Sequence, residues 1–220
     1  MAAVLDHIFV CTAPGAPAAS RLIDFGLREG TPNRHPGQGT ANRRFFFHNA
    51  MLELLYVENA AEAHSAQARS LGLWPRLSPE ASNACPFGII LRPAEDSQPE
   101  PPFPAWEYRP PTMPDLVLHI ATSTLLTEPF WAYAPAGLAP IHWPPERRQI
   151  VDHPRSLQDI TAVTISGPPL PAASVTRSIA ATGLLTWREA PGYSLELEFD
   201  NTPRKQHTSF HGDLPLTLRW

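Results

Sequence analysis

The chain has 220 residues, 43% of them hydrophobic, and its 21 acidic and 17 basic side chains give a formal net charge of −4. This length and apolar content allow a buried core, as one large or two small domains. The charge balance excludes the basic surface that nucleic-acid binding needs, and no apolar run has the length of a membrane span.

The N-terminal residues and the two cysteines favour a cytoplasmic protein. The segment MAAVLDHIFV has no basic residue before its apolar run and reaches Asp6 and His7 at once, which is unlike a secretory signal. Cys11 and Cys85 form no zinc-type pair and both have apolar neighbours, so we expect two reduced, packed thiols. The 27 prolines predict short elements joined by stiff loops.

The first quarter of the chain predicts one helix among several strands. Residues 30–42 are rich in Gly, Pro, Asn and His, which predicts a loop with room for one short strand. Gly26 is placed to end the helix that precedes this loop. The order is therefore β-α-(β)-β-β, with strands expected at 4–11, 43–48 and 51–57 and the helix at 18–25.

The middle of the chain has few regular elements and many prolines. A helix is expected over 60–71, and short strands over 86–92 and 115–122. Residues 94–114 and 129–145 are expected to be irregular.

The last quarter repeats features of the first in the same order. Residues 171–174 and 17–20 share the sequence PAAS, each copy leads to a Gly-Leu pair, and each is followed by a strand containing Leu-Glu-Leu, at 52–54 and 195–197. We interpret this shared order as two copies of one βαβββ unit. The alternation in 214–220 predicts a final edge strand.

Two polar residues stand within apolar strands and are candidates for a catalytic site. Glu53 interrupts an apolar run, and His7 lies in the same way between Leu5 and Ile8. A buried carboxylate is costly unless a cation, a proton or hydrogen-bond donors meet it. A His and a Glu in separate strands can form a metal or proton-transfer site. The alternatives are a structural core histidine and a glutamate on a half-exposed strand face.

The loop over 35–44 is a candidate for ligand binding. Gly37 permits backbone amides to approach an anion closely, and the neighbouring side chains offer neutral donors and a guanidinium. The candidate binding residues are Gln38, Gly39, Thr40, Asn42, Arg43 and Arg44. Since consecutive residues of a strand point to opposite faces, only one of the two arginines can line a cavity. The alternative is a rigid turn that satisfies only its own backbone.

The opening Asp-His-Ile of residues 6–8, together with a later strand bearing Glu53, resembles the vicinal oxygen chelate superfamily, which contains glyoxalase I, extradiol dioxygenases and fosfomycin-resistance proteins. HPGQGTANRRFFF and LELLYV are similar to its glyoxalase-like domain proteins. The resemblance implies an α+β fold in which two βαβββ modules form curved mixed sheets around a cavity. The modules would occupy 1–72 and 159–220, with a Pro-rich connection and two added strands over 73–158.

The resemblance also implies metal ligands on the first and last strands of each unit. It assigns His7, Glu53 and Glu196 to a divalent ion (Mn, Fe or Zn), with His7 and Glu53 as the catalytic groups. The fourth ligand position falls on Thr161 or Ala162, neither of which is a good ligand. A site without metal is therefore equally admissible.

Two functions follow from these features, and the sequence does not choose between them. One is a small-molecule enzyme with divalent-metal-assisted lyase, isomerase or dioxygenase chemistry on an oxygenated metabolite. The other is a metal-free protein of the binding or resistance type with the same fold. A structural scaffold ranks last. The expected partner is a small-molecule ligand, with no nucleic acid and no membrane, and the resemblance is compatible with a homodimer.

Overall fold

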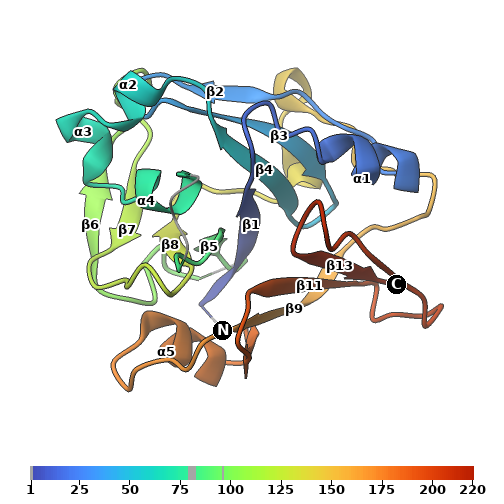
Figure 1. Cartoon of the computed structure of the whole chain (residues 1–220). Helices are drawn as coiled ribbons and strands as arrows, with labels where there is room; N and C mark the ends of the chain where they lie inside the picture. Colours follow the sequence, from blue (N-terminus) through green and yellow to red (C-terminus); the bar gives the residue numbers. More distant parts are fainter. Residues whose placement is uncertain (1, 79–82, 96) are drawn as a thin grey trace.

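The computed structural model describes residues 2–78, 83–95 and 97–220, in which the strands form two mixed sheets (Figure 1). The elements follow each other as β1 (Ala3–Cys11), α1 (Ala19–Phe25), β2 (Asn33–His35), β3 (Thr40–Phe46), β4 (Met51–Val57), α2 (Ala60–Ala63), α3 (Ala66–Arg69), α4 (Trp74–Leu77), β5 (Phe87–Pro93), β6 (Ala105–Tyr108), β7 (Leu118–Ala121), β8 (Phe130–Tyr133), the 3-10 turns η1 (Pro140–His142) and η2 (Pro145–Arg147), β9 (Ile160–Gly167), α5 (Val175–Ala181), β10 (Thr186–Glu189), β11 (Ser194–Phe199), β12 (His207–Ser209) and β13 (Leu216–Arg219). None of the helices in these ranges has the length and apolar character needed to cross a membrane.

The larger sheet consists of two halves with the same strand order and pairing. Its order is β2-β3-β4-β1-β5-β8-β7-β6. In one half β1 pairs in parallel with β4, and in the other β5 pairs in parallel with β8. The halves meet where β1 and β5 pair antiparallel. The sheet curls strongly, like half of a barrel (Figure 1). The prediction of an α+β protein with curved mixed sheets is confirmed.

The second copy of the first unit is β5 to β8, not the C-terminal segment. The smaller sheet has the order β10-β9-β11-β13-β12, in which the second strand, β10, pairs in parallel with the first, β9. The prediction that 159–220 form a βαβββ module is therefore wrong in its wiring. The strand expected at the edge, β13, lies between β11 and β12. The shared PAAS and Leu-Glu-Leu segments encode a helix start and a strand alternation, which do not determine strand pairing. The boundaries at residues 72 and 158 stay a prediction.

The predictions for single helices and strands agree with the structure better than the prediction of the second module does. The helix ends at Gly26, which has the positive φ of +113° that the prediction requires. The expected helix over 60–71 is divided into α2 and α3, which begin at the side-chain caps Asn59 and Ser65. The irregular segments at 94–114 and 129–145 contain the short strands β6 and β8.

The two faces of the larger sheet have different roles. Ile8 and Leu54 point to one face and belong to the main core, which also contains Leu195 and Leu216 of the smaller sheet. The next residues along the strands point to the other face, where Phe9 belongs to a separate apolar cluster. The convex face thus packs on the smaller sheet, and the concave face is left for a site.

Gly39 permits the close contact between the β2–β3 loop and α2. Its φ is +70°, and a Cβ there would lie 2.3 Å from the carbonyl oxygen of Asn59 and 2.4 Å from the amide nitrogen of Ala63. We expect Gly39→Ala to lower the free energy of unfolding by roughly 2–3 kcal/mol, because strain and a backbone clash add. Urea unfolding measures this loss.

Gly183→Ala is the matched control, since Gly183 has a φ of +81° and open space around its Cβ position. It should cost only the left-handed backbone strain, about 1–2 kcal/mol. Equal losses in the two variants would show that the contact with α2 contributes nothing.

Candidate functional site

The concave face of the larger sheet encloses a cavity of about 350 Å³, which lies within the range of small-molecule sites. Its lining comes from β1 to β8, from Gln38 and residues 71–73, and from the segments 110–116 and 134–147. The lining residues divide into a polar group and an apolar wall. The polar group is Asp6, His7, Asn33, His35, Gln38, Arg44, Glu53 and Arg147, and the wall includes Phe9, Leu55, Leu71, Leu73, Ile90, Ile120 and Phe130.

A β-bulge in β1 brings Asp6 and His7 to the same side. Leu5 pairs with Leu91 and His7 pairs with Ile90, so Asp6 is an extra residue in the ladder. Both Asp6 and His7 consequently line the cavity, although neighbours in a regular strand would face opposite ways. The Nδ1 atom of His7 lies 2.6 Å from Oδ1 of Asp6, which fixes the imidazole ring. Its Nε2 atom has no hydrogen-bond partner within the described ranges and is left for a ligand.

Glu53 lines the cavity together with His7, and it is buried, with 6% of the residue surface exposed. In the strand ladders Glu53 is opposite Phe9 of β1 and Arg44 of β3. His7, two residues before Phe9, is therefore the diagonal neighbour of Glu53 on the same face. A carboxylate, an imidazole and a guanidinium thus meet at one end of the cavity.

Two carboxylates determine the charge of His7. Burial disfavours the imidazolium, yet the negative charge of Glu53 and the hydrogen bond to Asp6 outweigh it, so the pKa of His7 is raised above 6.5. The protonated ring therefore adds stability that is fully present below pH 6.5 and is lost as the pH rises through the folded-state pKa.

This linkage predicts the pH dependence of a His7→Gln variant. The difference in the free energy of unfolding between wild type and His7→Gln should shrink as the pH rises above 6.5, because only wild type loses a stabilising proton. Urea unfolding at several pH values measures the difference. A difference that is constant or grows with pH would contradict the charge assigned to His7.

Arg43 and Arg44 point to opposite sides of β3, and the structure identifies the one in the cavity. Arg43 binds Glu29 in a fork, with Nε 2.7 Å from Oε1, and lies outside the cavity. Arg44 lines the cavity, and its Nε donates to the carbonyl oxygen of Thr31 at 2.7 Å. Burial lowers the pKa of Arg44, while the opposed charge of Glu53 raises it.

The β2–β3 loop contributes only one of its predicted binding residues, Gln38, to the cavity. Gly39 and Thr40 line a separate surface pocket between this loop and α2. Thr40 still acts on the site, because its Oγ1 lies 2.9 Å from Nδ1 of His35, which lines the cavity.

Asn42 and Gly37 support the loop itself. The buried Asn42 accepts a hydrogen bond from the amide of Asn33 at 2.9 Å and does not line the cavity. The amide of Gly37, expected to approach an anionic ligand, donates to Oε2 of Glu62 at 2.7 Å. The carboxylate of Glu62 thus occupies the position next to the Gly37 amide where the sequence suggests an anionic ligand.

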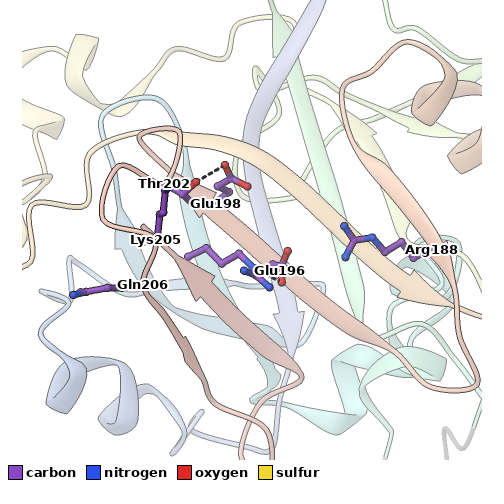
Figure 2. Close-up of a pocket in the computed structure, with 7 residues that line it drawn as sticks. Arg188, Glu196, Glu198, Thr202, Lys205 and Gln206 are labelled. Atoms are coloured by element: carbon purple, nitrogen blue, oxygen red, sulfur yellow. Dashed lines mark hydrogen bonds and ion pairs between the residues drawn. The ribbon is translucent and has the colours of Figure 1, made fainter.

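Glu196 does not join His7 and Glu53. It lies on β11 of the smaller sheet and forms a 2.6 Å ion pair with Arg219. Figure 2 shows it in a different pocket, among Arg188, Glu198 and other polar side chains. The assignment of Glu196 to the site followed from the Leu-Glu-Leu repeat, which carries no information on the strand that lies next to it. Thr161 also lies on the smaller sheet, on β9, where its hydroxyl donates to the backbone carbonyl of Glu198.

The residues around the cavity do not fit a divalent metal ion. The resemblance places ligands on the first and last strands of each unit, and in the second unit these strands are β5 and β8. Their cavity residues Ile90, Phe130 and Ala132 have no donor side chain. Across the described ranges, no three His, Cys, Asp or Glu side chains are grouped to hold a metal. His7 and Glu53 alone supply half of the expected ligand set.

The polar cavity residues that the sequence did not assign to the site include Asp6, Tyr108 and Arg147. Asp6 adjoins His7, and two consecutive polar residues in an apolar strand are a signal of a bulge. Tyr108 and Arg147 come from proline-rich segments without periodicity, so no sequence signal places them. His153 lies outside the cavity, where it is buried and connects the amide of Arg28 with the carbonyl of Phe46.

Comparisons with known proteins agree with this fold. A family model described as a glyoxalase-like domain matches residues 5–180. Among solved structures, a hypothetical protein from Staphylococcus aureus is similar with a TM-score of 0.53 and 12% identity, over 100% of this chain and 99% of that one. At such identity the likeness concerns the fold alone. No curated protein matches the sequence.

Proposed function

Since the chain belongs to the glyoxalase-like domain family, we propose that it is a small-molecule isomerase or lyase that works by proton transfer without a divalent metal. The observation that carries this proposal is that Glu53 and His7 line one cavity, to which the equivalent strands of the second unit, β5 and β8, contribute no donor side chain. A carboxylate and an imidazolium on one face are a base and an acid that act on the same substrate.

The proposed reaction begins with a substrate that has a C–H bond next to a carbonyl group. Glu53 takes the proton from this carbon, and the electron pair of the C–H bond moves to the carbonyl oxygen. His7 donates a proton from Nε2 to that oxygen, while Asp6 holds the ring through Nδ1. When the carbon that lost its proton bears a hydroxyl group, that hydroxyl gives its proton to the His7 ring and becomes the new carbonyl, while Glu53 returns its proton to the former carbonyl carbon, which gives an isomer. When the next carbon bears a leaving group, the enol gives its proton back to His7 and the electron pair expels that group, which gives the product of a lyase.

Hydrogen exchange tests this reaction without knowledge of the natural substrate. The probes are small 2-hydroxy ketones and 2-hydroxy aldehydes, incubated in D2O with protein that has been dialysed against a chelator. We expect NMR to detect deuterium at the carbon next to the carbonyl of at least one probe, at the same rate before and after chelation. Exchange that requires added Mn, Fe or Zn would overturn the metal-free mechanism.

Binding without turnover is the second candidate. It is favoured by the apolar wall, which contributes contact area but no chemistry. This candidate predicts that a ligand raises the melting temperature while no probe exchanges hydrogen. Thermal shift with the same panel, followed by the exchange measurement, distinguishes the two.

A further inference from the structure

Two guanidinium groups flank the polar end of the cavity. Arg44 and Arg147 both line it, one from β3 and the other from η2. The Arg44 guanidinium lies 5.1 Å from the ring centre of Phe46, and that of Arg147 lies 4.7 Å from the ring of Trp143. The two rings are in edge-to-face contact at 5.4 Å. One aromatic pair therefore holds both cations in place.

The charge around these arginines is incompletely balanced. Within the described ranges neither Arg44 nor Arg147 forms an ion pair. Of the two carboxylates in the cavity, Asp6 is bound to His7 and only Glu53 remains. Arg147 also acts on Arg44 as a like charge. An anionic ligand group would relieve this repulsion.

The remainder of the cavity requires an apolar group. The wall is a continuous cluster, separate from the main core, that contains Phe9, Leu55, Leu71, Leu73, Ile120 and Phe130. Water gains few hydrogen bonds along such a surface, and an apolar chain that displaces it is favoured in proportion to the area buried.

We propose that the ligand of this cavity is a monoanionic carboxylate with an apolar body, whose head group is bound by Arg44 and Arg147. A carboxylate fits the fork of a guanidinium. A phosphate ester carries close to two negative charges, and Glu53, opposite Arg44 in the strand ladder, disfavours a dianion. This inference rests on the proposed function, because it assigns the substrate class of the same cavity.

Calorimetric titration with four probes of equal chain length tests the head group. Octanoate should bind wild type, and octanol, octylamine and octyl phosphate should bind at least tenfold more weakly. Butanoate should bind more weakly than octanoate if the wall receives the chain. Preference for octyl phosphate, octylamine or octanol would overturn the carboxylate assignment.

Arg147→Gln is the informative variant because Arg147 is exposed and its loss should leave the fold intact. We expect a loss of octanoate affinity of roughly ten- to a hundredfold, as for a charge-assisted hydrogen bond. Arg155→Gln is the matched control, since Arg155 also lies over an aromatic ring, that of Phe25 at 4.3 Å, but outside the cavity. Equal affinity of Arg147→Gln and wild type would overturn the inference.

The two proposals fail in different ways. If octanoate does not bind while a probe exchanges hydrogen, only the carboxylate assignment falls. If octanoate binds and depends on Arg147 while no probe exchanges hydrogen, the catalytic proposal falls and the carboxylate assignment stands.

Discussion

A Glu53→Gln variant should exchange substrate hydrogen roughly 100- to 10,000-fold more slowly than wild type, the range observed when a general base is removed. Glutamine has nearly the same shape but accepts no proton at neutral pH. Arg44, opposite Glu53 in the strand ladder, would then face an uncharged amide. The measurement is the initial rate of deuterium incorporation by NMR.

Glu196→Gln is the matched control for this variant. Both glutamates stand in a Leu-Glu-Leu strand, but Glu196 is paired with Arg219 on the smaller sheet. Its replacement should leave the exchange rate unchanged. If the two variants lose activity equally, the proposed base is wrong. If Glu53→Gln retains the wild-type rate, proton transfer takes place elsewhere.

An Arg76→Met variant should lower the free energy of unfolding by about 3–5 kcal/mol. The Arg76 side chain is buried, and its guanidinium donates to four backbone carbonyl oxygens. These belong to Cys85 at 2.9 Å, Leu125 at 3.1 Å, Leu126 at 3.2 Å and Glu128 at 2.5 Å. Methionine packs in a similar volume but removes this donor, so the carbonyls of Cys85 and Glu128 lose it, while those of Leu125 and Leu126 still accept from the backbone amides of Glu128 and Cys85. Urea unfolding measures the loss.

Arg69→Met is the control for Arg76→Met. Its only hydrogen bond from the side chain among the described residues is a 3.5 Å contact to the carbonyl oxygen of His64, and it is exposed. We expect a change within about 0.5 kcal/mol. If Arg76→Met is as stable as Arg69→Met, water replaces the guanidinium at these carbonyls. The hydrogen bonds of Arg76 would then not stabilise the packing of α4 against the segments before β5 and β8.

The first unit was predictable because its information is local. In β1 and β4 an apolar run extends over a full strand and is interrupted by Asp6 and His7 in one case and by Glu53 in the other, so His7 and Glu53 could be assigned to buried strands before any pairing was known. The alternating direction of side chains along a strand also separates Arg43 from Arg44. It does not say which of them faces inward, because the deciding partner, Glu29, lies in a loop.

The second unit was not predictable because its strands are short and its pairings are distant. β6 and β8 have four residues each, too few for a periodic pattern, and both lie among prolines. The bulge at Asp6 depends on the register with β5, more than eighty residues along the chain. The PAAS repeat then suggested the wrong copy, since it stands at the start of both α1 and α5 although the helices lead to differently paired strands. Even the helix starts differ, because Ala18 precedes α1 without a side-chain cap and Ser174 caps α5.

The central place of β1 has a consequence for biosynthesis. β1 lies between β4 and β5, both of which follow it in the chain, so it leaves the ribosome before either neighbour exists. The ribosome must add roughly fifty more residues before β4 is complete and can pair with β1, and more still before β5 can pair with it. A nascent chain with such an unsatisfied segment is a natural substrate for chaperones. Translation speed through the first unit should therefore affect the yield of folded protein more than its final stability.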